Sequence, residues 1–156
     1  MKTAVFPGSF DPVTVGHMDL IKRSAGMFDR LVIGVLVNLG KSPLFSLEER
    51  VKMLQSLTAD FANVEGKSFD GLLADFVEQE QAVVIVRGLR SSQDFEYELP
   101  LAQANHKLNP NADTVFLATA PEHSYISSSG VKEIHNFGGD IQGMVPDIVL
   151  QRLAES

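Results

Sequence analysis

The sequence contains no cysteine, and no apolar run in it approaches the ~20 residues that a membrane-spanning helix needs. Without cysteine the chain has neither a disulfide framework nor thiol chemistry, and a cytosolic setting fits this composition. The first apolar run meets Pro7 and Gly8 too early to form the apolar region of a signal peptide. These absences predict a soluble protein that does not enter a membrane.

Basic residues are also scarce, since 13 Lys and Arg stand against 20 Asp and Glu, for a formal charge of −7. Wrapping a nucleic-acid backbone requires clustered Lys and Arg, so the sequence predicts no nucleic-acid partner. A small anionic ligand stays open, because a few local cations can act inside an acidic protein. The length of 156 residues and the 44% of hydrophobic residues fit one domain with a real core.

Short apolar runs alternate with segments of helical periodicity along the chain. Strands are expected at residues 3–6, 31–37, 61–66, 82–86 and 114–118. Helices are expected over 14–28, from a capping box at Ser46 and Glu49, from Asp70, over 92–108, from Ser128 and from Pro146. This alternation predicts an α/β fold, a single domain with a Rossmann-like, doubly wound parallel sheet flanked by helices.

In such a sheet ligands bind beyond the carboxyl ends of the strands, so the residues that follow each strand carry the functional information. After the first strand come residues 7–12 (PGSFDP), and His17 then lies in the first turn of a helix. Glycine lets backbone approach a ligand closely, and a helix start attracts anions. Taken separately, the loop is an ordinary turn and His17 a surface residue. Together they predict phosphate binding.

Further cations and hydroxyl groups follow other strands. Arg87 and Arg90 flank Gly88 and Leu89 directly beyond a buried strand, and guanidinium groups suit phosphate oxygens. Asp94 and Glu98, one helical turn apart, could instead offset those arginines. Lys41 alone reads as a solvated lysine. Residues 124–129 (SYISSS) precede a helix, where serine is an ordinary N-cap or part of an anion cradle.

The inventory contains no nucleophile beside a base, no metal-ligand cluster and no P-loop lysine motif. It predicts a phosphate-binding α/β domain whose substrate brings its own nucleophile.

Four segments in order resemble the phosphopantetheine adenylyltransferase family. They are residues 7–12, residues 14–17 (TVGH), residues 87–90 (RGLR) followed by 94–98 (DFEYE), and residues 126–129 (ISSS). The second segment is similar to the His-x-Gly-His motif of the wider nucleotidyltransferase superfamily, in a Thr-x-Gly-His form. The resemblance covers nearly the whole chain, and implies one nucleotidyltransferase domain over residues 1–156.

The resemblance implies reversible transfer of AMP from ATP to 4′-phosphopantetheine, giving dephospho-coenzyme A and pyrophosphate, with Mg²⁺. It also implies a cytoplasmic homohexamer and names coenzyme A as a candidate feedback inhibitor. Carried onto this chain, the catalytic residues are His17, Lys41 and Arg90, and the pantetheine-binding residues are Ser9, Lys41, Leu73 and Arg87. The implied ATP-binding residues are Ser9, Phe10, His17, Gly88, Leu89, Arg90, Glu98, His123, Ser124, Tyr125, Ile126, Ser127, Ser128 and Ser129. No protein metal ligand is implied, because Mg²⁺ would mainly bind phosphate oxygens.

Three positions depart from the family's pattern. His123 stands where a large aromatic residue is common, and Ser9 is one of two usual hydroxyl residues at its site. Pro100 lies inside the helix that carries Glu98, where it removes a backbone hydrogen bond and is expected to bend the helix. Two alternatives remain: a sister nucleotidyltransferase acting on nicotinamide mononucleotide or using CTP, and a nucleotide-binding module without turnover.

Overall fold

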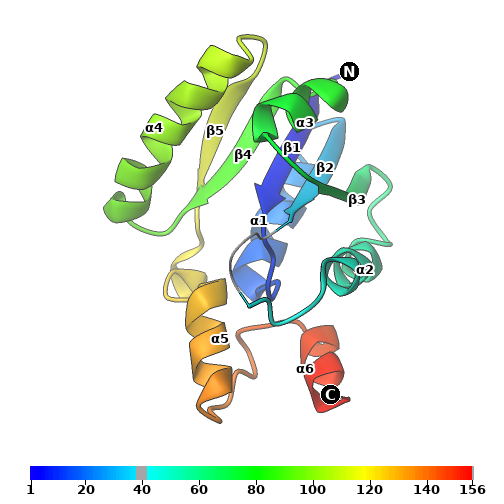
Figure 1. Cartoon of the computed structure of the whole chain (residues 1–156), viewed down its shortest axis with the longest axis vertical. Helices are drawn as coiled ribbons and strands as arrows, with labels where there is room; N and C mark the ends of the chain where they lie inside the picture. The colour runs from blue at the N-terminus through cyan, green and yellow to red at the C-terminus, as the bar shows by residue number, and fades with distance from the viewer. Residues whose placement is uncertain (38–41, 156) are drawn as a thin grey trace.

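The computed structural model describes residues 1–37 and 42–155 and contains a five-stranded parallel sheet with the strand order β3-β2-β1-β4-β5 (Figure 1). The strands are β1 (Thr3–Gly8), β2 (Arg30–Leu36), β3 (Val64–Phe69), β4 (Val84–Leu89) and β5 (Asp113–Ala118). The helices are α1 (Val15–Ala25), α2 (Leu47–Leu57), α3 (Leu73–Gln79), α4 (Ser92–Leu108), α5 (Ser128–Asn136) and α6 (Asp147–Ala154), with a 3₁₀ turn η1 (Pro121–His123). The predicted Rossmann-like α/β fold is confirmed.

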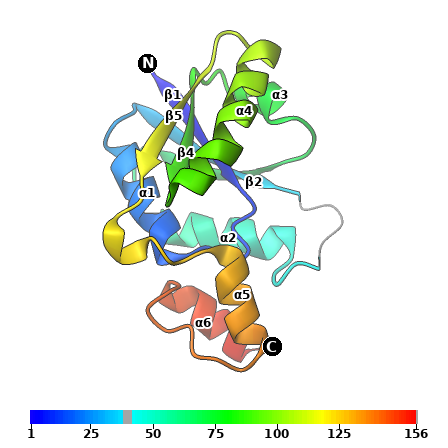
Figure 2. The same cartoon turned by 90° about the vertical axis from the view of Figure 1, so that its left-hand side faces the viewer.

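Both faces of the sheet are covered, because successive residues of a strand point to opposite sides. Ala4 and Phe6 of β1 belong to a core shared with α1 and α2, whereas Val5 belongs to a second core that includes α3. Helices α5 and α6 lie beyond the carboxyl ends of the strands, as Figures 1 and 2 agree. The chain therefore places α5 across the edge of the sheet where ligands bind in this fold.

The sheet opens between β1 and β4. Their register pairs stop at Val5 and Ile85, although β1 stays paired with β2 as far as Gly8, and β4 with β5 as far as Leu89. The strand order reverses at the same place, since β2 and β3 extend to one side of β1 and β4 and β5 to the other. This is the topological switch point, where doubly wound sheets form their ligand crevice.

Polar side chains close the first turns of the helices. At α2 the predicted capping box is confirmed: Ser46 Oγ accepts the Glu49 N–H at 3.1 Å, and Glu49 Oε1 accepts the Ser46 N–H at 3.3 Å. Thr14 and His17 form a second capping box at α1, in which an imidazole replaces the usual carboxylate or amide. The helix start predicted to bind phosphate is thus fixed by His17 itself.

Two element predictions are corrected by the structure. Helix α3 begins after Leu72, and Asp70 does not start it, because Gly71 between them has a φ of +90° that helices do not adopt. Strand β3 begins at Val64, later than expected. The side chain of Asn63, just before it, donates to the carbonyls of Ala25 and Phe28 in the turn between α1 and β2.

Helix α4 runs through Pro100 as one assigned helix, so the proline does not end it. Pro100 has no N–H to donate to the carbonyl four residues earlier in the helix. Because Pro100 lies on the exposed side of α4, water can donate to that carbonyl instead. Within residues 1–37 and 42–155, no helix combines the length and hydropathy needed to cross a bilayer.

Candidate active site

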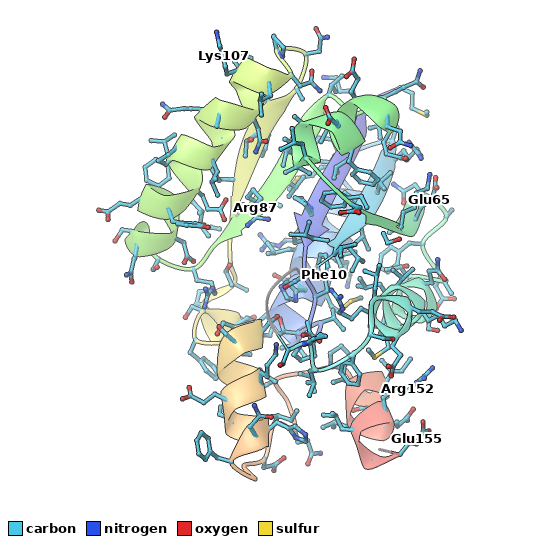
Figure 3. All side chains as sticks on the ribbon, viewed as in Figure 1. Phe10, Glu65, Arg87, Lys107, Arg152 and Glu155 are labelled. Carbon is cyan, nitrogen blue, oxygen red and sulfur yellow. The ribbon has the colours of Figure 1, made fainter. Side chains whose placement is uncertain are left out.

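A cavity of about 250 Å³ lies at the carboxyl edge of the sheet, where β1 and β4 separate. Its walls come from β1 and the loop after it, the start of α1, the end of β4, α4 and the start of α5. Figure 3 labels Arg87 on β4 and Phe10 beyond the end of β1. The cavity is lined by His17, Arg87 and Arg90 together, as the sequence predicted.

The tautomer of His17 follows from the capping box. Its Nδ1 accepts the backbone N–H of Thr14 at 3.0 Å, so Nδ1 carries no proton and the neutral ring has its proton on Nε2. Burial, with the positive charges of Arg87 and Arg90 added, lowers the pKa of His17 from 6.5 to about 4. At neutral pH His17 is therefore an uncharged ring whose Nε2–H is the donor it can offer a ligand.

Phe10 fixes the orientation of that ring. Its φ of 48° is a conformation that bulky residues rarely adopt, so packing must hold it. The Phe10 side chain is buried, with its ring edge-on to Phe6 at 5.7 Å and to His17 at 4.9 Å between centroids. The loop after β1 thus supports the imidazole by ring packing, in addition to the hydrogen bond from the backbone of Thr14.

We expect the proton resonances of His17 to titrate near pH 4 and to show no midpoint between pH 5.5 and 8, as followed by NMR. Since the folded pKa lies below the unfolded value of 6.5, the unfolded chain binds this proton more readily. Stability is therefore lost as the pH falls from about 6.5 to 4, and His17 adds no pH dependence above that window. Assignment uses His17→Gln, whose spectrum lacks the signal. A midpoint near 6.5 would contradict the neutral assignment.

Arg87 is held rigidly at the gap between β1 and β4. Its Nε and Nη2 donate to the two carboxylate oxygens of Glu98 at 3.0 and 2.6 Å, and its Nη1 donates to the carbonyl of Pro7 at 2.9 Å. The last bond crosses from β4 to β1 beyond the point where their ladder stops. Arg87 thus stands in the opening with its guanidinium plane fixed.

Arg90 is held more loosely. Its Nε lies 3.4 Å from Oδ2 of Asp94, and the same oxygen accepts the backbone N–H of Arg90 at 2.8 Å. The suggestion that Asp94 and Glu98 offset the two arginines is therefore confirmed, one carboxylate for each. Next to them Gly88 packs closely on α1, because a Cβ there would meet a terminal methyl of Leu20, which would have to shift.

The serines before α5 mainly fix the backbone. Ser127 Oγ accepts the Gly130 N–H at 3.0 Å as N-cap, and Ser128 Oγ donates to the carbonyl of Pro12 at 2.8 Å. Both residues line the cavity. What they present to a ligand is therefore chiefly the N-terminus of a nine-residue helix, which favours anions.

Most of the residues predicted for the site line one cavity: Ser9, Phe10, His17, Arg87, Gly88, Arg90, Glu98, Ile126, Ser127 and Ser128. The cavity is not lined by Leu73, Leu89, His123, Ser124, Tyr125 or Ser129. Leu73 packs instead beside the core under α3, Ser124 Oγ donates to the Pro121 carbonyl, and Tyr125 is exposed. Lys41 lies outside the described residues, so its role stays a prediction.

Sequence reasoning overlooked two buried charged residues that brace the cavity walls. Asp11 accepts the N–H groups of Leu44 and Phe45 at 2.8 and 2.9 Å and binds Lys132 Nζ of α5 at 3.0 Å. Arg50 of α2 donates to the carbonyls of Ser9, Leu36 and Phe45.

These overlooked residues differ in how readily sequence analysis could have found them. Asp11 could have been noticed as an acid in the loop after the first strand, whereas Arg50 has the sequence pattern of a surface helix residue. Thr119, which also lines the cavity, directly follows β5 and could have been found by reading the residues after each strand.

Comparison with known proteins shows the family to which this chain belongs. The family model described as cytidylyltransferase-like matches residues 5–134. A phosphopantetheine adenylyltransferase of Caldanaerobacter subterraneus subsp. tengcongensis is 52% identical, over 99% of this chain and 97% of the relative. The protein of that name from Lachnoclostridium phytofermentans is 55% identical, over 97% and 93%. The chain belongs to the phosphopantetheine adenylyltransferase family.

The family assignment agrees with a solved structure at the level of fold. A Vibrio parahaemolyticus protein, provisionally named a nicotinate-nucleotide adenylyltransferase, aligns with a TM-score of 0.72 at 18% identity, covering 99% of this chain and 94% of that one. At 18% identity the similarity shows that the two proteins share a fold and shows nothing about a shared substrate. The family assignment itself rests on the relatives of about 50% identity.

Proposed function

We propose that this chain reversibly transfers AMP from ATP to the phosphate of 4′-phosphopantetheine, giving dephospho-coenzyme A and pyrophosphate in coenzyme A biosynthesis. The observation that carries the proposal is the neutral imidazole of His17 beside Arg87 and Arg90 in the cavity at the switch point, in a member of this family. Two cations and an uncharged donor suit a reaction between two anionic phosphate groups.

In the proposed reaction an oxygen of the phosphopantetheine phosphate attacks the α-phosphorus of ATP. A new P–O bond forms, and the bond to the β-phosphate oxygen breaks with its electron pair, releasing pyrophosphate. The attacking phosphate is largely dianionic at neutral pH, so no protein base is required. Arg87 orients the acceptor phosphate, Arg90 offsets the charge of the nucleotide phosphates, and the Nε2–H of His17 stabilises charge that develops during transfer.

Mg²⁺ enters this proposal together with ATP. Within residues 1–37 and 42–155, no group of three or more His, Asp or Glu side chains could hold a metal ion. The two carboxylates in the cavity, Asp94 and Glu98, are both engaged with arginines. Phosphate oxygens and water are ligands that Mg²⁺ prefers, so we propose that MgATP is the form bound.

A coupled assay of pyrophosphate formation against a panel of acceptors tests the proposed function. We expect release from ATP with 4′-phosphopantetheine and none when the acceptor is omitted. Equal turnover with nicotinamide mononucleotide, or a preference for CTP over ATP, would assign a sister activity. ATP binding without product at high enzyme concentration would leave only a nucleotide-binding module.

Arg87→Ala is expected to weaken binding of 4′-phosphopantetheine about 10- to 30-fold, because a charge-assisted contact to phosphate is lost. Binding of pantetheine, which lacks the phosphate, should change less than about threefold. Calorimetric titration of both ligands measures the difference, with Arg152→Ala as a control outside the cavity. Equal weakening of both ligands would show that Arg87 acts on the pantetheine arm or on folding.

We propose in addition that the chain forms a homohexamer in the cytoplasm and that dephospho-coenzyme A and coenzyme A compete for the acceptor side of the cavity. Exposed apolar side chains on α4 and the edge strand β5 support assembly. They are Phe95, Tyr97, Leu99, Leu101, Leu108 and Val115. Such a surface on a monomer favours contact with another copy.

A further inference from the structure

Both arginines of the cavity are paired with carboxylates of α4, but the two pairs differ in burial and geometry. Glu98 is 8% exposed, and its two carboxylate oxygens accept hydrogen bonds from Arg87 at 2.6 and 3.0 Å. The side chains of Arg90 and Asp94 are 39% and 25% exposed, and their ion pair has a single contact of 3.4 Å. Charges that face solvent attract weakly, whereas a buried bidentate pair is costly to open.

The Arg87–Glu98 pair leaves Arg87 able to bind a phosphate. A guanidinium has five N–H donors, of which three are used, two by Glu98 and one by the carbonyl of Pro7. One N–H on each terminal nitrogen therefore remains for a ligand. A phosphate can occupy these donors without displacing Glu98, so the ion pair and the ligand are compatible.

Separating Glu98 from Arg87 would be unfavourable. The carboxylate of Glu98 is buried on α4, so without Arg87 it would be an unpaired buried charge, which is costly. Arg90 faces no such penalty, because Asp94 is partly solvated and can also keep its contact to the backbone N–H of Arg90. Opening the Arg90–Asp94 pair would therefore cost less than opening the Arg87–Glu98 pair.

We propose that Glu98 is a positioning residue: it keeps the guanidinium of Arg87 fixed so that its two remaining donors meet the phosphate of the acceptor substrate. The inference rests on the proposed function and assigns Glu98 to the acceptor side of the cavity. It differs from a direct contact to the nucleotide, which the family resemblance implied for this residue. Because the effect of Glu98 passes through Arg87, the two positions are coupled.

Glu98→Gln tests the proposal. Glutamine has nearly the same shape but places an N–H₂ group opposite a nitrogen of Arg87, so one of the two hydrogen bonds from Arg87 is lost. We expect the KM for 4′-phosphopantetheine to rise about 10-fold, with the KM for ATP changed less than about twofold. Glu96→Gln, on the same helix and exposed, is the matched control and should resemble the wild type.

A double-mutant cycle with Arg87→Ala completes the test. Once Arg87 is absent, Glu98→Gln should raise the KM for 4′-phosphopantetheine less than about twofold further. Glu98→Asp retains the charge but is shorter, so an intermediate KM is expected, and this variant carries the test if Glu98→Gln does not fold.

A rise in the KM for ATP alone, or an equal rise for both substrates, would overturn the proposal. So would additive effects of the two substitutions. A wild-type enzyme without 4′-phosphopantetheine turnover would instead refute the proposed function, so the two failures are distinguishable.

Discussion

Replacing His17 with alanine is expected to lower kcat about 100- to 1000-fold, which corresponds to the loss of roughly 3 kcal/mol of transition-state stabilisation. The Nε2–H of His17 is neutral and pre-oriented by Thr14, so no reorganisation is needed as charge develops on the transferring phosphoryl group. The dissociation constant of ATP should change less than about threefold, because this donor acts mainly in the transition state. Steady-state kinetics and equilibrium ATP binding give the two quantities.

His135→Ala on α5 is the matched control, since that histidine does not line the cavity. His17→Gln retains a side-chain N–H and should recover part of the lost turnover. Near-normal turnover in His17→Ala would refute the catalytic role. A loss of ATP affinity as large as the loss of turnover would show that His17 acts in ground-state binding.

Replacing Asp11 with alanine is expected to reduce the free energy of unfolding by about 3–5 kcal/mol, the range for removing one partner of a buried ion pair. The Asp11 side chain is 2% exposed, and its loss leaves Lys132 and the N–H groups of Leu44 and Phe45 without their acceptor. Turnover should fall as well, because Asp11 joins two walls of the cavity, the loop after β1 and α5, to each other. Urea denaturation measures the stability change.

Asp75→Ala is a suitable comparison, because Asp75 is exposed on α3 and its removal should cost less than about 1 kcal/mol. Lys132→Met in the Asp11→Ala background should restore part of the stability by removing the unpaired charge. A loss of less than about 1 kcal/mol in Asp11→Ala would show that water replaces the carboxylate at little cost.

The sequence predicted the fold and the location of the site because both depend on patterns that are local along the chain. Apolar runs alternate with helical periodicity, and in a parallel sheet the carboxyl ends of strands meet at one edge. His17, Arg87 and Arg90 could therefore be expected at one place before any contact was known. The Ser46 capping box was equally readable, since it spans only four residues.

Other features depend on contacts between distant segments and could not be read in this way. The end of the β1–β4 ladder at Val5 and Ile85 is set by packing, and it opens the cavity. Which of Asp94 and Glu98 pairs with which arginine could not be read from the sequence, since the two carboxylates lie only one helical turn apart. Arg50 becomes visible only when α2 packs beside the loop of Ser9. The start of α3 was misplaced because the φ of Gly71 is not encoded by residue type alone.

The hydrogen bond from Ser128 to the carbonyl of Pro12 joins positions 116 residues apart, and this separation has a consequence for translation of the chain. During synthesis the loop after β1 is made early, yet the wall of the cavity that α5 contributes is made only when α5 leaves the ribosome. Until then the nascent chain has an incomplete cavity. Products of interrupted translation that stop before α5 would accordingly lack this wall and the Ser128 hydrogen bond that joins it to the loop.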